Sequence, residues 1–192
     1  MELPRVACEL PMEDRRLLES ARNARVRGVL LSDGHAERTL SGGSDEFSVS
    51  ALALDMDQRL LIAAESVDVG PRAEAFRLRV FGESASFSVA MQERLRSPES
   101  CPAELDLAAL SRGVLRPAVL RFKTSMTVEI VPGTEGRIDL ISDGGLIFLG
   151  SSGAVLLVEH DHEVPLNLRI TTSSKVIERA VSRALGRPGE EV

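Results

Sequence analysis

The first half of the chain changes its hydrophobic period from helical to strand-like near residue 24. Residues 12–23 carry Leu17, Leu18 and Ala21 at helical spacing, which predicts a short amphipathic helix. From residue 24 onward apolar and polar positions alternate, as is typical of strands. This alternation predicts short strands over 24–32, 46–54, 59–64, 75–82 and 85–91, with a weaker strand after residue 34. Strands so closely spaced favour a small antiparallel barrel or sandwich.

The second half is again strand-like and ends in a helix. Its apolar runs predict strands over 117–122, 125–131, 137–141, 146–150, 154–159 and 164–171. Two of these runs, LIFLG and AVLLVE, are apolar almost throughout, which indicates strands buried on both faces. The Ser-Asp-Gly-Gly segment at 142–145 is predicted to be a turn between two apolar strands. An apolar stripe over 174–185 predicts a helix that closes one end of a barrel or meets a partner helix.

Residues 97–111 interrupt the strand pattern with two prolines and a run of charged residues, which favours a domain boundary there. A chain of 192 residues is long enough for one large or two small domains. We therefore predict an all-β fold with terminal helices, built as two small split β-barrels. The first would span 12–96, the linker 97–111, and the second barrel with its closing helix 112–187.

Composition narrows the range of partners. With six Phe and neither Tyr nor Trp, the chain is poor in the exposed rings on which single-stranded nucleic acids stack. A net charge of −6 and a pI near 5.2 disfavour a general DNA-binding surface. No apolar run approaches the roughly 18–20 residues of a membrane helix, and the acidic, proline-containing start is unlike a signal peptide. Cys8 and Cys101 form no metal-type pair, so we expect a soluble cytoplasmic protein with reduced thiols.

Two short segments carry candidate binding chemistry. Arg112 and Arg116 could clamp a phosphate and stack on a flat ring, because each guanidinium offers a rigid fork of donors and a planar face. A solvated surface pair is the alternative. At Ser142–Gly145, glycines would let the backbone approach a ligand and the Ser142 hydroxyl could donate to it. An ordinary hairpin turn is the alternative there.

Metal binding and catalysis find less support. His160 and His162 could place two imidazoles on one face of an extended segment, but a tight metal site needs three or four ligands. A polar hairpin loop is the favoured interpretation of 159–163, and a metal-dependent protein is a remote alternative. The chain contains no Gly-x-Ser-x-Gly motif, no phosphate-binding loop and no convincing Cys–His pair. We therefore expect a protein that is not an enzyme and has no cofactor.

Taken in order, these parts resemble the PilZ superfamily, and within it the two-domain flagellar-brake (YcgR-like) proteins. The R-x-x-x-R motif of that family matches at Arg112 and Arg116. The family's second motif, D/N-x-S-x-x-G, matches at Ser142 and Gly145 but has Leu140 where the family has Asp or Asn. The closing helix is also similar, and the agreement in the first half is architectural.

The resemblance implies binding of cyclic di-GMP at the domain junction. Arg112 and Arg116 would contact phosphates and guanine faces, while Ser142, Gly145 and the position of Leu140 would form the second contact. The implied function is a non-enzymatic regulator whose ligand alters the binding of a protein partner, in motility or surface behaviour. Because Leu140 lacks the polar anchor, the alternative is a degenerate PilZ-like interaction adaptor that binds no nucleotide.

Overall fold

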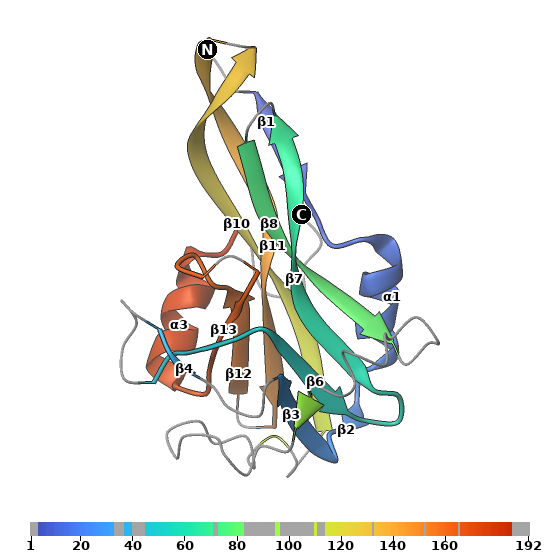
Figure 1. The fold of residues 1–192 in the computed structure, drawn as a ribbon. Coiled ribbons are helices and arrows are strands. Elements are labelled where there is room, and N and C mark those ends of the chain that lie inside the picture. Colours follow the sequence, from blue (N-terminus) through green and yellow to red (C-terminus); the bar gives the residue numbers. More distant parts are fainter. Residues whose placement is uncertain are drawn as a thin grey trace.

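The computed structural model describes residues 4–32, 37–39, 45–70, 73–82, 95–96, 110, 114–131, 133–151, 153–164 and 166–185. The described part of the chain is mostly β-sheet with two helices, α1 (Met12–Ser20) and α3 (Ser174–Arg183) (Figure 1). The strands of the first half are β1 (Arg5–Cys8), β2 (Ala24–Arg25), β3 (Gly28–Ser32), β4 (Glu37–Arg38), β5 (Phe47–Val49), β6 (Ala51–Asp55), β7 (Leu60–Gly70), β8 (Ala73–Gly82) and β9 (Leu95–Arg96). Those of the second half are β10 (Val114–Val131), β11 (Thr134–Gly150), β12 (Gly153–His160) and β13 (Leu168–Thr171).

The described strands form two sheets. One has eight strands in the order β2-β10-β11-β12-β13-β5-β4, with β1 added in parallel beside β11. The other has five strands in the order β8-β7-β6-β3-β9. The predominance of antiparallel strands and the two helices agree with the sequence prediction, whereas β1 lies in a segment for which the sequence pattern predicted no strand.

The two halves of the chain share a sheet and a core. β5 comes from the first half, yet it pairs antiparallel with β13 near the end of the chain. A single large hydrophobic cluster includes Phe47 and Leu54 from the first half together with Phe148 and Ile170 from the second. Leu110, in the expected linker, is buried in the same cluster. The division into barrels at 12–96 and 112–187 stays a prediction, and any such units are joined by this common core.

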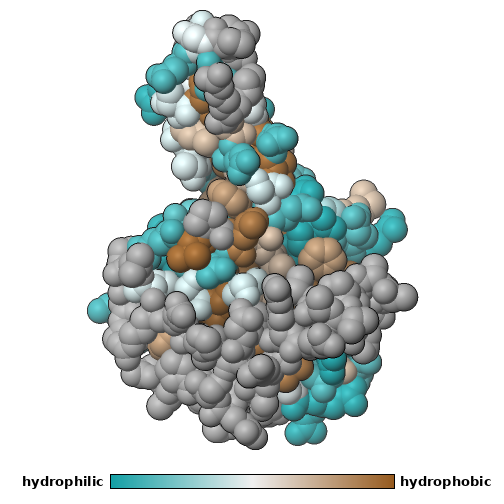
Figure 2. Space-filling view, in the orientation of Figure 1, coloured by the Kyte–Doolittle hydropathy of each residue, from teal (hydrophilic) through white to brown (hydrophobic). Residues whose placement is uncertain are grey.

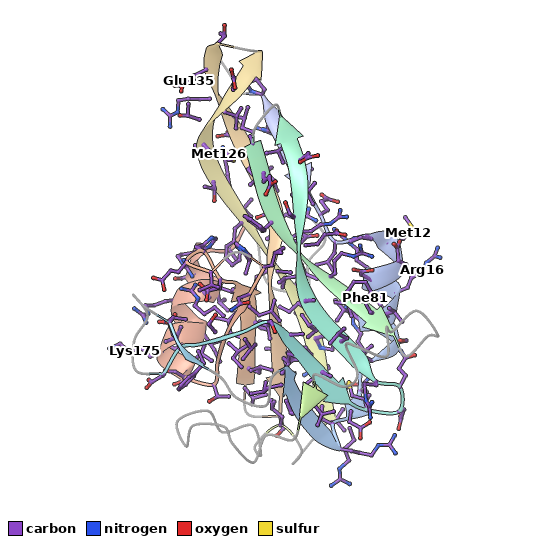
Figure 3. The ribbon with its side chains drawn as sticks, viewed as in Figure 1. Met12, Arg16, Phe81, Met126, Glu135 and Lys175 are labelled. Carbon is purple, nitrogen blue, oxygen red and sulfur yellow. The ribbon has the colours of Figure 1, made fainter. Side chains whose placement is uncertain are left out.

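Strands β11 and β12 are buried on both faces, as their continuous apolar runs predicted. Leu146 and Phe148 of β11 point into the large cluster, whereas Ile147 between them packs in a second cluster on the other face. Helix α3 covers that second face with Val176, Ile177 and Ala180. The predicted C-terminal helix is thus confirmed, and within this chain its apolar stripe packs on the sheet. Lys175 points outward from the same helix (Figure 3).

Two long hairpins project from the body as an arm, which we define as the distal parts of β10–β11 and β7–β8 together with β1 (Figures 1 and 2). The hairpins are held together by a small apolar cluster of Cys8, Ala75 and Leu140. Met126 and Val67 are half-buried against that cluster. Glu135 points away from the arm near its tip (Figure 3). The arm therefore has a thin apolar centre of its own, continuous with the body through β8 and β11.

Helix α1 is attached to the sheets by charge as well as by apolar contacts. Leu18 packs into the large cluster, and Leu17 contacts it from the edge. Asp14 is buried and accepts hydrogen bonds from the Val80 backbone N–H at 2.8 Å and from Arg79 Nε at 2.7 Å. On the solvent side Met12 points away from the sheets (Figure 3). The predicted helix over 12–23 is confirmed, although it ends at residue 20.

The predicted turn at Ser142–Gly145 is wrong. These residues lie inside the continuous strand β11, which pairs with β10 along nearly its whole length. The pairing shifts between Leu120 and Arg121, so that Gly144 is the extra residue of a β-bulge. The chain reverses instead at Gly133, whose φ of 81° is readily adopted by glycine. The glycines at 144 and 145 serve close packing, not chain reversal.

Several further sequence predictions differ from the structure in detail or concern residues that it does not describe. The strands predicted at 117–122 and 125–131 are one strand, β10, and the strand predicted at 164–171 begins only at Leu168. The strand predicted at 85–91 lies outside the described residues. No helix among the described residues is long and apolar enough to cross a membrane. Cys8 is a free, buried cysteine, and Cys101 lies outside the described residues.

Replacing Phe47 by Ala should test the shared core. Phe47 is completely buried, and its strand joins the first half of the chain to β13. We expect the free energy of unfolding to fall by about 3–5 kcal/mol. Urea unfolding followed by circular dichroism should show a single transition in both wild type and variant. Two separate transitions, of which only one shifts in the variant, would contradict the shared core.

Candidate functional site

In the described part of the chain, the residues predicted to bind a ligand do not lie together. Arg112 lies outside the described part of the chain. Arg116 is exposed on β10, opposite Leu149 of β11, whereas Ser142 lies opposite Phe122 on the same hairpin. The six-residue separation along β10 corresponds to about 20 Å at the usual rise of a strand. Arg116 and Ser142 are therefore at different levels of the hairpin.

Leu140 is a packing residue of the arm. Its side chain is 8% exposed and contacts the apolar cluster with Cys8 and Ala75. On the backbone it pairs with Val6 of β1 on one side and with Thr124 of β10 on the other. A carboxylate at this position would be buried among apolar groups, which is costly without a partner. The leucine therefore suits its surroundings, independently of any ligand.

The adjacent acid, Asp139, is also engaged within the chain. Its carboxylate accepts a hydrogen bond from the Ser125 hydroxyl at 2.6 Å and an ion pair from Lys123 Nζ at 2.7 Å. These contacts, first that of Lys123 and then that of Ser125, hold the pKa of Asp139 below its usual value. The carboxylate nearest to Leu140 in sequence is thus used to join β10 and β11 across the arm.

Asp143 is the most completely buried acid of this segment and connects three parts of the chain. Its carboxylate accepts the backbone N–H of Leu10 at 2.9 Å, Arg15 Nη2 at 2.8 Å and Arg121 Nε at 2.8 Å. The hydrogen bond with Asp143 raises the pKa of Arg121 above its usual value. Sequence reasoning missed this cluster because Leu10 and Arg15 are more than 120 residues away from Asp143 and the members share no motif.

Gly145 is required by close packing on β11. A Cβ atom at Gly145 would lie 3.1 Å from Leu120 Cβ and 3.1 Å from Phe122 Cε2. At Gly144 a Cβ atom would lie 3.3 Å from the ring of Phe122. Both glycines therefore let the ring of Phe122 lie against the bulge. This close approach, and not access for a ligand, accounts for their presence.

A pocket of about 170 Å³ lies beside the bulge, and we call it the His160 pocket. It is formed where β8, β10, β11, the end of β12 and the end of α3 meet. Its lining residues are Phe76, Phe122, Lys123, Thr124, Ser142, Gly144, Glu159, His160, His162 and Arg183. Of the sequence-predicted binding residues, only Ser142 contributes to it. The two histidines that the sequence singled out as a possible metal pair both contribute.

His160 is packed at the wall of this pocket. It is the last residue of β12 and is 6% exposed, so the prediction of a polar loop for 159–163 is wrong at Glu159 and His160. Its ring stacks on Phe76 with centroids 4.3 Å apart and planes 6° apart, and His162 meets it edge-on at 5.2 Å. Burial, followed by the charge of His162, lowers the pKa of His160 to about 4. The imidazole is therefore neutral at pH 7.

Burial also leaves an imidazole nitrogen without a partner. The Nε2 atom of His160 is inaccessible and has no hydrogen-bond partner in the structure. Oδ2 of the next residue, Asp161, is also buried and has no hydrogen-bond partner in the structure. The other carboxylate oxygen of Asp161, Oδ1, accepts the backbone N–H of Glu163 at 3.0 Å. Buried polar atoms without a partner are uncommon in folded proteins. Two of them occur at the end of β12, beside the pocket.

A second charge cluster lies around Glu159, next to His160. Arg169 of β13 donates to Glu159 of β12 and lies 3.2 Å from Glu46, joining both buried carboxylates. Arg183, at the end of α3, approaches Glu159 at 3.4 Å from the solvent side. The guanidinium of Arg183 also lies over the ring of Phe122, 5.8 Å from its centroid. The helix thus contributes one cation to the rim of the pocket.

The histidine pair does not form a metal centre with other ligands. Among the described residues, no group of three or more His, Cys, Asp or Glu side chains is placed to hold a metal ion. His160 is buried against Phe76 on one face, and Glu159 is already bound by arginines. A two-ligand arrangement is too few for a tight zinc site. The metal-dependent alternative therefore has no support from the described residues.

Comparison with known proteins adds no relative to this picture. No protein-family model, no curated protein and no solved structure matches the chain. The site must therefore be interpreted from its own residues.

Removing the Asp143 carboxylate should destabilise the protein strongly. An Asp143→Ala variant leaves the buried Leu10 N–H unpaired and separates Arg15 and Arg121 from their shared acceptor. We expect a loss of about 2–4 kcal/mol in the free energy of unfolding. Glu9→Gln is the matched control, because Glu9 contacts the same two arginines from an exposed position and should cost less than about 1 kcal/mol. Urea unfolding measures both, and equal losses would contradict the assigned role of Asp143.

The buried imidazole should make stability depend on pH. The pKa of His160 is about 4 when folded and 6.5 for the ordinary group, so the unfolded chain binds the proton more readily. Stability that is present above pH 6.5 is therefore lost as the pH falls toward 4. Between pH 7 and pH 5 we expect a loss of about 2 kcal/mol from this group. Urea unfolding of wild type and His160→Phe checks this, because the phenylalanine keeps a ring on Phe76 but cannot titrate. An equally steep decline in the variant would refute the assignment.

Proposed function

We propose that this chain is a non-enzymatic, PilZ-like protein-interaction adaptor that does not bind cyclic di-GMP at its second motif. The observation that carries this choice is the burial of Leu140 in the apolar cluster of the arm. The resemblance implies a polar anchor at that position for a nucleotide ligand. The nearby acids, Asp139 and Asp143, are bound by residues of the chain itself. Of the two hypotheses from the sequence, these contacts favour the adaptor.

The arm supports the interaction part of the proposal. β10 pairs with β11 along its length, but on its other side it pairs with β2 only at Val114 and Leu115. The Asn23 N–H also donates to the Leu115 carbonyl at 3.1 Å, and the Leu185 N–H donates to the Arg121 carbonyl at 2.7 Å. An unpaired strand edge offers backbone donors and acceptors on which an extended peptide can add a strand. The edge of β10 from Lys123 to Thr127 is thus the surface we assign to a protein partner.

The side chains of this edge fit a reversible contact. Lys123, Thr124, Ser125 and Thr127 are all exposed on the distal half of β10. Such an edge is polar and carries a lysine, which opposes indiscriminate edge-to-edge aggregation. Specific binding would rest on backbone pairing with a complementary peptide. The motility or surface process implied by the PilZ resemblance remains the proposed setting.

The competing hypothesis is a cyclic di-GMP receptor. It retains the exposed Arg116 and the Ser142 hydroxyl at the His160 pocket as possible contacts. The pocket of about 170 Å³ is smaller than the roughly 300–1,000 Å³ of typical sites for larger small-molecule ligands. A dinucleotide would therefore have to lie mainly on the outside of the fold.

Calorimetric titration with cyclic di-GMP should separate the two functions. For the adaptor we expect no binding heat at ligand concentrations on the order of tens of micromolar. Leu140→Asn, which restores a polar residue to the motif, should lose stability without gaining binding, because its amide would be buried in an apolar cluster. Binding by the wild type that Arg116→Ala abolishes would establish the receptor instead. A gain of binding in Leu140→Asn would show that the motif is accessible and would also contradict the adaptor.

A further inference from the structure

The size of the His160 pocket limits its occupant to about one ring. A cavity of about 150 Å³ is large enough for one benzene molecule. The His160 pocket has about 170 Å³ and opens between secondary-structure elements that are fixed by packing on the large core. It is therefore suited to a single small ring with a short polar substituent.

The lining favours a flat ring. Phe122 and the stacked pair of Phe76 and His160 contribute three planar side chains to one small space. The ring of Phe122 lies so close to Gly144 and Gly145 that a Cβ atom at either position would press against it. Aromatic rings attract other rings through offset or edge-on contacts. A planar aromatic ligand uses these faces better than a flexible chain of the same volume.

The charges at the rim favour an anion. Lys123 and Arg183 both line the pocket, and their side chains are 44% and 59% exposed, so neither cation is buried in its present ion pair. Each now approaches a carboxylate that has a further partner. Glu159 keeps Arg169 if Arg183 turns away, and Asp139 keeps the Ser125 hydroxyl if Lys123 does.

These rim cations can therefore bind an anion without leaving a buried carboxylate unpaired. The remaining polar groups can complete its hydrogen bonds. The hydroxyl-bearing residues Ser142 and Thr124 line the same space. His160 adds a neutral imidazole at the wall.

We propose that the His160 pocket binds a small planar aromatic carboxylate, with its ring against Phe122 and His160 and its carboxylate between Lys123 and Arg183. The site shares Lys123 and Thr124 with the β10 edge assigned to a protein partner above, so ligand and partner would meet at adjoining surfaces. The pocket itself is defined by its rings and rim cations, which the adaptor function does not require.

Benzoate is the probe that tests this proposal. The chain has three histidines, so ring resonances in nitrogen–proton correlation spectra of labelled full-length protein can be assigned with His160→Phe and His162→Gln. Benzoate should shift the His160 and His162 resonances saturably at constant pH and ionic strength. A dissociation constant on the order of 1 mM is expected for a ligand of this size. Benzyl alcohol, with the same ring and no charge, should bind at least about tenfold more weakly.

Charge variants test where the carboxylate lies. The double variant Lys123→Gln/Arg183→Gln should bind benzoate at least about tenfold more weakly than wild type. Lys175→Gln removes one positive charge from the first turn of the same helix, where the side chain points away from the sheet, and should leave binding unchanged (Figure 3). The unfolding midpoint of each variant, measured in parallel, identifies any loss of binding that results from loss of the fold. Phe122→Leu, which keeps an apolar side chain but removes the ring, should also weaken binding.

Three outcomes would overturn the proposal. One is the absence of a saturable shift at benzoate concentrations about tenfold above the expected dissociation constant. Another is equal binding of benzoate and benzyl alcohol, which would leave the rim cations without a role. The last is unchanged benzoate binding in a folded double variant, which would place the ligand elsewhere. None of these results depends on cyclic di-GMP, so they are distinct from a failure of the adaptor function.

Discussion

The buried carboxylate of Asp143 is the interaction on which the arrangement around the arm depends. It joins the segment before α1, the helix itself and β10 through Leu10, Arg15 and Arg121. Helix α1 has only nine residues and no side-chain cap at its start, so it would not be stable alone in water. Asp14, on the same helix, makes the corresponding contact with β8. Two adjacent helix residues thus attach α1 to both sheets by buried charge.

The bulge that carries Asp143 also determines what lies around it. Because β11 continues through the bulge, β10 and β11 extend beyond the body and form the arm. The two glycines after Asp143 admit the ring of Phe122, and that ring becomes one wall of the His160 pocket. A segment whose composition suggested a ligand-binding turn therefore serves first as a structural junction. Its relation to ligand binding is indirect, through the pocket that it helps to shape.

The packing around β11 also explains why residue 140, on which the proposed function depends, is a leucine. Once β1 lies beside β11 and β8 lies across it, the side chain at this position faces Cys8 and Ala75. An apolar residue is the stable choice there, and a polar anchor would be buried without a partner. The leucine at position 140, where the sequence differs from the motif that it resembles, is thus consistent with the local packing. Arg116 lies on an exposed part of β10.

The sequence by itself determined the helices, most of the strands and their inward faces, because the periods of 3.6 and 2 residues depend only on local backbone geometry. It also indicated that LIFLG and AVLLVE are buried on both faces. Only the tertiary structure decided that Ser142–Gly145 continues a strand, since a bulge is favoured by the partner strand and not by the glycines alone. It likewise decided that His160, Asp143 and Leu140 are buried. Their partners come from segments far away in the chain, and long-range packing leaves no trace in local spacing.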